Sequence, residues 1–436
     1  MAPFLLFKEN NMHQPPKGVR LHIGVYGRRN AGKSSLINAL VGQHVSIVSA
    51  TPGTTTDPVE KTLEMPPLGP VVLLDTAGLD DVGPLGEARM LQTQRTLSRV
   101  DMALLVVGAN GWGQTEESLL DALRRHDTPC MVAFTWNDVA DPAPTVLKRV
   151  TELGIAHCRV AFPPGGECRR GLPELREVLL RTASSAAPSP LSVAPLLADL
   201  LPSPRGEEAP VVLLVTPVDS GAPKGRLILP QAQALRDALD AGAMTVMARE
   251  TELAAALSRL AAPPDLVVCD SQVVGQTVFT VPDSIPLTTF SILMARCKGD
   301  LPLLAQGAAA IRQLRPGHRV LVAEACSHHP QADDIGRVKI PRWLRERVGE
   351  GLRVDFTAGA DFPEDMTPWK LVLHCGACTL TRKAMHTRMA RAVAAGIPIT
   401  NYGLAISLLQ GALRRTLSPF PDAQAAFDVA AADAAV

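Results

Sequence analysis

Short apolar runs alternate with stretches of helical periodicity over most of the chain. The first four runs are rich in Val, Ile, Leu and Met, as is typical of strands buried on both faces; they are LHIGVYG at 21–27, VVLLDTAG at 71–78, DMALLVVG at 101–108 and TPCMVAFTW at 128–136. Strands that alternate with helices predict a parallel sheet with right-handed crossovers. We therefore expect an α/β domain over residues 18–182, preceded by a flexible arm at residues 1–18.

The same alternation returns twice beyond a segment rich in Ser, Ala and Pro at residues 181–195, which predicts a linker or a domain boundary. A small block at residues 190–275 has strand-like runs such as APVVLLVTPVDS and PDLVVCDSQ. A further block at residues 285–415 contains HRVLVAEACSHH and WKLVLHCGAC, followed by a helical stretch and the run IPITNYG. The Ala- and Asp-rich residues 421–436 we expect to be frayed. The pattern predicts an α/β protein of three domains.

Composition narrows the classes of function. The chain has 436 residues with 43 basic and 43 acidic side chains, so its charge favours neither nucleic acid nor an anionic membrane as a partner. It has no apolar run long enough to span a bilayer and no signal-peptide layout, which predicts a cytoplasmic protein. Since thiols stay reduced there, the eight cysteines do not predict a disulfide framework.

A glycine-rich loop between the first expected strand and helix carries the first chemical signal. The segment Gly27-Arg-Arg-Asn-Ala-Gly-Lys-Ser34 matches the P-loop pattern of GTP-binding proteins, and Asp75-Thr-Ala-Gly78 completes it after the second strand. Backbone N–H groups of such a loop cradle phosphates, and Lys33 is expected to reach the β- and γ-phosphates. The sequence thus predicts a GTPase.

Three side chains in this region are expected to hold Mg²⁺: Ser34, the switch threonine Thr55 from TPGTTTD, and Asp75 through water. Gly78 can donate its N–H to the γ-phosphate. The full set of residues expected at the nucleotide consists of Gly27, Asn30, Ala31, Gly32, Lys33, Ser34, Ser35, Thr55, Asp75, Gly78 and Asp138.

Two departures from regulatory GTPases concern turnover and base recognition. Leu79 follows Gly78, where many such proteins carry a glutamine that orients the attacking water, so we expect slow hydrolysis. The loop GRRNAGKSS is similar to that of potassium-activated tRNA-modifying GTPases, in which the residue matching Asn30 ligates K⁺; the alternative is that Asn30 only caps the loop. The guanine-reading segment is Thr135-Trp136-Asn137-Asp138, in which Asp138 alone keeps its expected place.

Cysteine and histidine side chains follow two of the later strands. Cys326-Ser-His328-His329 ends one expected strand, and His374-Cys375-Gly-Ala-Cys378 ends another. Because parallel strands end at the same edge of a sheet, we expect these side chains at one ligand-binding edge. Three cysteines with nearby histidines fit either Zn²⁺ or an iron–sulfur cluster, and spacing does not separate the two metals. We expect His374 to orient a metal ligand rather than to bind the metal itself.

A P-loop GTPase joined to CxH and HCxxC motifs resembles the HydF family, the GTPases of FeFe-hydrogenase maturation. The resemblance covers about residues 18–415, and its specific part is CSHH, HCGAC, KGRLILPQ, PDLVVCDSQ and LTTFSILMARCKGDL. It implies three α/β domains: a P-loop GTPase with a mostly parallel sheet at 18–182, a dimerisation domain at 190–275 and an iron–sulfur cluster domain at 285–415.

The resemblance also implies cofactors and partners. A 4Fe-4S cluster would be held by Cys326, Cys375 and Cys378, with an exchangeable fourth position or a weak ligand in His328 or His374. The protein would be a homodimer that carries the di-iron precursor of the hydrogenase active site, built by radical-SAM enzymes, to the apo-hydrogenase. GTP, Mg²⁺ and K⁺ at Asn30 complete the expected ligands, with neither membrane nor nucleic acid involved.

Two other functions fit parts of the sequence. One is an RNA- or ribosome-associated GTPase with a structural zinc domain, against which the neutral charge and the low aromatic content, 4%, both count. The other is a zinc-dependent hydrolase with a regulatory nucleotide domain. That class calls for an HExxH motif or a glutamate general base beside the metal ligands, and the sequence has neither.

Overall fold

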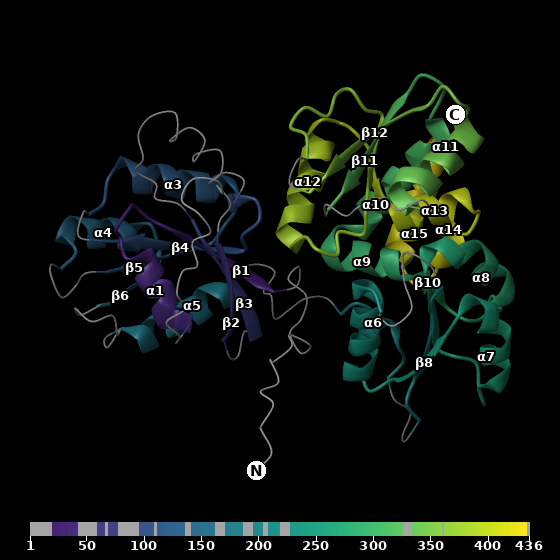
Figure 1. Ribbon diagram of the computed structural model, residues 1–436, viewed down its shortest axis with the longest axis horizontal. Helices are drawn as coiled ribbons and strands as arrows, with labels where there is room; N and C mark the ends of the chain where they lie inside the picture. The colour runs from purple at the N-terminus through teal and green to yellow at the C-terminus, as the bar shows by residue number, and fades with distance from the viewer. Residues whose placement is uncertain are drawn as a thin grey trace, which may run out of the picture. The chain divides into compact units, whose positions relative to one another are not determined.

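The computed structural model describes the chain in segments that together hold three sheets. The described residues are 20–41, 59–65, 69–76, 96–108, 111–135, 141–161, 171–185, 195–203, 208–218, 227–325, 334–359 and 362–433. The chain divides into two compact units, residues 1–193 and residues 194–436 (Figure 1). The expected arm at residues 1–18 lies outside the described residues.

The first unit is built on a six-stranded sheet in the order β2-β3-β1-β4-β5-β6. Its strands are β1 (Leu21–Tyr26), β2 (Val59–Met65), β3 (Gly69–Asp75), β4 (Met102–Val107), β5 (Cys130–Phe134) and β6 (Ala156–Arg159). β2 pairs antiparallel with β3, and the other pairs are parallel. β1 and β4 are buried along their whole length, as continuous apolar strands between two helical layers should be.

Helices cover both faces of this sheet. They are α1 (Lys33–Val41), α3 (Gln114–Arg125), α4 (Pro144–Glu152) and α5 (Leu172–Ser185). Apolar side chains of α1 and α5 pack on one face, and those of α3 and α4 pack on the other. α5 extends into the segment predicted as a linker from residue 181, so the start of that prediction is wrong; residues 186–194 lie outside the described residues.

The second unit contains two four-stranded parallel sheets (Figure 1). The smaller sheet has the order β10-β9-β7-β8, from strands β7 (Val211–Val215), β8 (Met244–Ala248), β9 (Leu266–Cys269) and β10 (Leu287–Thr289). Its helices are α6 (Leu229–Asp240), α7 (Leu253–Arg259), α8 (Val274–Thr280) and α9 (Phe290–Lys298), with short 3₁₀ turns at Ala198–Leu200, Glu250–Glu252 and Ser271–Val273.

The C-terminal sheet has the order β12-β11-β13-β14. Its strands are β11 (Arg319–Glu324), β12 (Arg353–Ala358), β13 (Leu371–His374) and β14 (Ile399–Asn401). Its helical segments are α10 (Leu301–Ala309), a 3₁₀ turn (Ala310–Gln313), a π-helical turn (Ile335–Lys339), α11 (Ile340–Val348), α12 (Arg382–Ala394), α13 (Tyr402–Leu409), α14 (Leu413–Thr416) and α15 (Pro421–Asp433).

A single hydrophobic core runs through both sheets of the second unit, from Leu196 to Ala431. The predicted fraying after residue 421 is therefore wrong for most of that segment. α15 buries Phe427 and Ala431, and Arg312 stacks over the Phe427 ring. Alanine has the highest helix propensity, which favours a helix here. The Phe427 ring packs this helix into the core, which the composition alone did not indicate. The predicted α/β class is confirmed.

Candidate functional site

The P-loop lies between β1 and α1 and depends on three residues with positive φ. Gly27 has φ 152°, Asn30 has φ 60° and Gly32 has φ 92°. A side chain at Gly27 would place its Cβ 2.3 Å from the Val106 carbonyl oxygen, so only glycine fits there. Asn30 is one of the few residue types that adopts the left-handed region readily. The loop is thus shaped by two glycines that the motif requires and by an asparagine at one of its variable positions.

Lys33 opens α1 and turns back into this loop. Its side chain is only 9% exposed, and Nζ donates to the carbonyl oxygens of Gly27 at 2.9 Å and Arg28 at 2.8 Å. Two carbonyl contacts fix the ammonium inside the loop that would surround the phosphates. A positive charge held in this place, beside the N-terminus of α1, favours a phosphate anion.

Asp75 and Ser34 meet at the end of the sheet. Asp75 is the last residue of β3, which pairs with β1, and it accepts a hydrogen bond from Ser34 Oγ at 3.3 Å. Burial raises the pKa of Asp75, and the Lys33 ammonium and the Ser34 hydroxyl oppose that rise. A carboxylate and a hydroxyl at one point are oxygen ligands of the kind that Mg²⁺ prefers. The structure therefore brings together Lys33, Ser34 and Asp75, as expected.

Two supports of the P-loop were missed by sequence reasoning. Arg28 Nε and Nη2 donate to the two carboxylate oxygens of Glu116 at 2.8 and 2.7 Å, and Glu116 is 2% exposed on α3. Thr135 Oγ1 donates to the Ala31 carbonyl oxygen at 2.6 Å. Thr135 is the first residue of the imperfect guanine-reading segment, so this segment contacts the P-loop. Both partners lie far along the chain, and no local pattern marks them.

Several predicted nucleotide residues lie outside the described part of the chain: Thr55, Gly78, Leu79, Trp136, Asn137 and Asp138. Their roles in switching, turnover and base recognition therefore stay predictions. Ala31 and Ser35 lie within the described loop and the first turn of α1, respectively.

The second predicted site lies at the carboxyl edge of the C-terminal sheet. β11 and β13 are parallel neighbours in which Ala323 pairs with His374, so the residues after both strands reach the same edge. Cys375 follows β13 directly, and its Sγ accepts from the Ala325 N–H at 3.1 Å. Cys326 and His328, which follow Ala325 along the chain, lie outside the described residues.

The turn from Cys375 to Leu380 is held in an uncommon conformation. Ala377 has φ 53°, and the Leu380 N–H donates to the Ala377 carbonyl at 3.0 Å. Burial raises the pKa of the Cys378 thiol, while backbone N–H groups of Cys378 and Thr379 and the Lys298 ammonium act to lower it. N–H groups directed at both sulfurs stabilise thiolates, the form in which cysteine binds metal. The donor set at Cys375 and Cys378 therefore fits a thiolate-bound metal or iron–sulfur cluster.

His374 is fully buried, and both of its ring nitrogens are engaged. Nδ1 contacts the Cys375 carbonyl oxygen at 2.8 Å and Nε2 contacts an Arg388 Nη1 at 2.9 Å. Since the guanidinium can only donate, Nε2 accepts and Nδ1 carries the proton. Burial lowers the pKa of His374 to about 3, and the Arg388 guanidinium adds to this effect. The imidazole is neutral and orients the backbone of Cys375, which favours a supporting role over a ligand role.

Within the described residues, no group of three or more His, Cys, Asp or Glu side chains is placed to hold a metal ion. Two of the three predicted cysteine ligands belong to the described chain. The other described cysteines, Cys130, Cys158, Cys269 and Cys297, lie on other elements, in keeping with a structural role. The part of the chain that the structure describes also contains no helix long and apolar enough to cross a membrane.

Family models match three consecutive parts of the chain. Residues 22–136 match a 50S ribosome-binding GTPase model, residues 197–299 match the hydrogen maturase F dimerization domain, and residues 302–419 match the hydrogen maturase F tetramerization domain. The last two models together span just over half of the chain. The described residues at the P-loop and those at the Cys375 edge thus fall within separate matched domains.

Curated relatives match parts of the chain. The tRNA modification GTPase MnmE of Synechococcus sp. (strain JA-2-3B'a(2-13)) is 36% identical over 171 residues, which is 38% of this chain and 34% of the relative. GTPase Der of Chloroflexus aurantiacus (strain ATCC 29366 / DSM 635 / J-10-fl) is 43% identical over 93 residues, 20% of each chain. The chain thus spans about a third or less of the length of these curated relatives.

Among solved structures, the G domain of the T. maritima FeoB iron transporter is similar to this chain with 26% identity and a TM-score of 0.30. The match covers 38% of this chain and 99% of that domain.

Proposed function

Because the chain belongs to the hydrogen maturase F family, we propose that it binds and slowly hydrolyses GTP and carries a 4Fe-4S cluster in FeFe-hydrogenase maturation. The proposed cluster site is supported by the carboxyl edge of β11 and β13, where Cys375 Sγ accepts a hydrogen bond from the Ala325 N–H. Its partners would be radical-SAM maturation enzymes and the apo-hydrogenase, which would receive a di-iron precursor from this scaffold.

The nucleotide half of the proposal rests on the P-loop geometry. The loop N–H groups and Lys33 would bind the phosphates, with Lys33 already fixed by the carbonyl oxygens of Gly27 and Arg28. Ser34 and Asp75 would hold Mg²⁺, which supplies charge neutralisation between the phosphates. Thr55 is proposed as a further Mg²⁺ ligand and Asp138 as a hydrogen-bond acceptor for the guanine, as the sequence motifs indicate.

Asn30 is proposed as a ligand of K⁺. Its left-handed backbone places an amide-bearing residue inside a loop otherwise shaped by glycines. A monovalent cation beside the phosphates would stabilise the negative charge that develops during hydrolysis. GTP hydrolysis measured in K⁺ should exceed that in Na⁺ at equal ionic strength. Equal rates would leave Asn30 with a role in shaping the loop only.

Cys326, Cys375 and Cys378 are proposed to hold the cluster, which would supply an exchangeable iron position for the carried group. His374 would act by orienting the Cys375 backbone, since both ring nitrogens are already bonded. The fourth position would then be open, or weakly held by His328. An open position suits a carrier because a bridging ligand can bind there and later leave.

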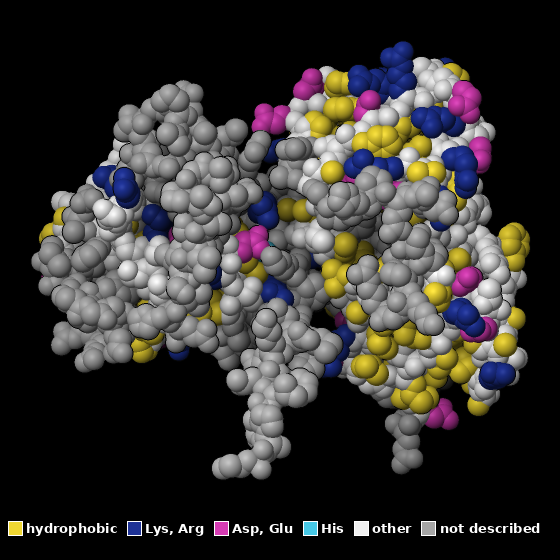
Figure 2. Space-filling model, in the orientation of Figure 1, with side chains coloured by type: hydrophobic (Ala, Val, Ile, Leu, Met, Phe, Trp, Pro, Cys, Tyr) yellow, Lys and Arg dark blue, Asp and Glu magenta, His cyan; other side chains and the backbone are white. Residues whose placement is uncertain are grey.

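A homodimer is proposed through the edge strand β8 of the smaller sheet. Leu239 on α6 is 52% exposed and Met244 on β8 is 56% exposed, and hydrophobic side chains gather over this part of the second unit (Figure 2). An apolar edge strand is a ready template for pairing with a second copy. Sedimentation velocity should show a dimer that Met244→Asp shifts toward monomer; an unchanged dimer would place the interface elsewhere.

Anaerobic reconstitution with iron and sulfide tests the cluster proposal. The parent protein should take up iron and give the EPR signal of a reduced 4Fe-4S cluster, and Cys375→Ser should abolish both. Cys130→Ser, which changes a thiol of the N-terminal sheet, is the matched control and should bind like the parent.

Tight zinc binding without cluster uptake would instead favour the alternative of an RNA- or ribosome-associated GTPase with a structural zinc domain. That alternative draws on the ribosome-binding GTPase model, which matches residues 22–136, and on the MnmE relative, which matches 38% of the chain.

A further inference from the structure

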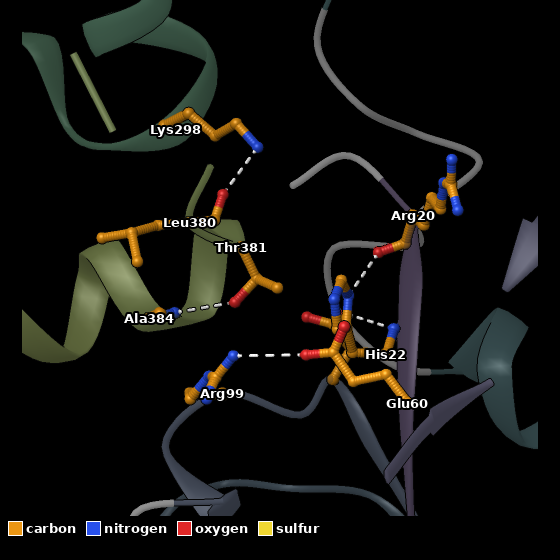
Figure 3. Close-up of polar contacts among 9 residues, drawn as sticks. Arg20, His22, Glu60, Arg99, Lys298, Leu380, Thr381 and Ala384 are labelled. Carbon is orange, nitrogen blue, oxygen red and sulfur yellow. Dashed lines mark hydrogen bonds and ion pairs between the residues drawn. The ribbon is translucent and has the colours of Figure 1, made fainter. Parts of the chain in front are cut away.

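A lysine at the end of α9, which follows the smaller sheet, contacts the turn that carries the two described site cysteines. α9 follows β10 of that sheet and ends at Lys298, which is 2% exposed. Lys298 Nζ donates to the Leu380 carbonyl oxygen at 2.9 Å, across 82 positions of sequence (Figure 3). Leu380 lies two residues after Cys378, so the contact joins the smaller sheet to the cysteine turn.

The contact acts on a turn that needs support. Ala377 occupies the left-handed region, which costs energy for a residue with a Cβ. On the far side of the turn, Thr381 caps α12 by accepting the Ala384 N–H at 3.1 Å (Figure 3). Lys298 therefore holds the turn at Leu380, between the strained residue and the capped helix.

The same ammonium brings a positive charge to the cysteine turn. Lys298 is buried, and its Nζ contacts the carbonyl oxygen of Leu380, two residues beyond Cys378. In a poorly solvated site such an interaction is stronger than it would be in water. The ammonium therefore favours negative charge at this turn.

We propose that Lys298 is a positioning residue of the cluster site, which holds the Cys375–Leu380 turn and stabilises the reduced cluster by its positive charge. The inference rests on the proposed 4Fe-4S cluster. One-electron reduction adds a negative charge to the cluster and its thiolates without forming or breaking a covalent bond. A nearby buried cation stabilises that form, and net charge is one of the factors that set the potential of such clusters. Lys298 thus raises the midpoint potential.

The test compares four forms of the full-length protein after anaerobic reconstitution: the parent, Lys298→Met, Lys298→Arg and Lys370→Met. Lys370 is an exposed lysine that directly precedes β13, the strand that leads to Cys375. The Lys370→Met variant therefore removes the same charge at the opposite end of that strand. Iron content, thermal unfolding and the midpoint potential by EPR-monitored titration are measured for each form. The electrons come from a chemical reductant such as dithionite.

Lys298→Met should lower the midpoint potential, while Lys298→Arg and Lys370→Met should stay near the parent value. Loss of iron in Lys298→Met that Lys298→Arg restores would also support the proposal, because arginine keeps the charge. An unchanged potential in iron-loaded Lys298→Met, or an equal shift in Lys370→Met, would overturn it. If the parent itself takes up no cluster, the proposed function fails before Lys298 is tested, so the two failures are distinguishable.

Discussion

The P-loop and the cysteine turn each receive a buried lysine that donates to loop carbonyl groups, but the two lysines come from different distances. Lys33 bonds to carbonyl oxygens five and six residues earlier in its own motif. Lys298 donates to the Leu380 carbonyl from 82 residues away, and it lies at the end of α9, a helix of the smaller sheet's domain. The nucleotide loop therefore carries its cation within its motif, whereas the cysteine turn receives one from a neighbouring domain.

The two loops therefore depend on their surroundings to different degrees. A motif that includes its own cation can occur in many proteins as one piece, which fits the match of residues 22–136 to a GTPase family model. A turn that is contacted by a lysine of another domain keeps that contact only while both sheets stay packed on their common core. The following predictions test how far this contrast holds.

The largest effect is expected for Lys33→Ala. Removing the ammonium should weaken GTP binding by about 100-fold or more, roughly 3 kcal/mol, because charge-assisted hydrogen bonds to phosphate are lost. Fluorescent-nucleotide titration measures this. Lys148→Ala, which removes an exposed lysine of α4, should bind like the parent. Normal binding by Lys33→Ala would overturn the assignment of this loop.

The next prediction asks whether the P-loop is as self-contained as Lys33 suggests. Glu116→Gln breaks the pairing of a buried carboxylate with Arg28 and should lower the free energy of unfolding by about 2 kcal/mol. Glu117→Gln is the adjacent control, since Glu117 pairs with Arg149 at a more exposed position and should cost about 0.5 kcal/mol or less. Equal losses in urea unfolding would mean that burial of Glu116 is not what matters.

The third prediction concerns a cysteine in the sheet that supplies Lys298. Burial raises the pKa of Cys269 to about 12, from an ordinary value of 9.0. As pH rises past 9, the unfolded chain loses this proton and the folded chain keeps it, so stability falls through that range. Between pH 8 and pH 10 the parent should lose about 1.4 kcal/mol more unfolding free energy than Cys269→Ala does. Parallel pH profiles would contradict the buried, protonated state of this thiol.

The smallest effect is expected for Thr135→Val, which removes the hydroxyl that donates to the Ala31 carbonyl. A lost hydrogen bond of this kind is worth about 1 kcal/mol, so GTP affinity should fall about fivefold. Thr151→Val on the exposed surface of α4 should leave affinity unchanged. A loss as large as that of Lys33→Ala would show that the loop depends mainly on distant residues, which would weaken the contrast drawn above.

Residues placed by a recognisable motif or by the order of parallel strands were predictable from the sequence. The order from β1 through the P-loop to α1, the meeting of Ser34 with Asp75, and the position of Cys375 at the end of β13 all follow from motif spacing and parallel strand order. Short strands with little apolar length, such as β10 and β12, gave no comparable signal.

Contacts made by folding could not be predicted in this way. Arg28 and Glu116, Lys298 and Leu380, and His374 and Arg388 are joined only when separate elements pack together. α15 is a related case, because its Ala- and Asp-rich composition suggested a frayed end until the position of Phe427 in the core was known. Packing supplied the missing information in each instance.

The position of Lys298 bears on how this protein can be divided in the laboratory and how it could have been assembled in evolution. The two oligomerisation models meet between residues 299 and 302, immediately after α9. A fragment started at that seam would keep every cysteine of the HCGAC turn yet leave its lysine behind. Recombination at the same seam would pair the turn with an unrelated helix. The boundary between the two family models falls between Lys298 and the turn that it contacts, so a fragment meant to keep the turn intact should begin before α9.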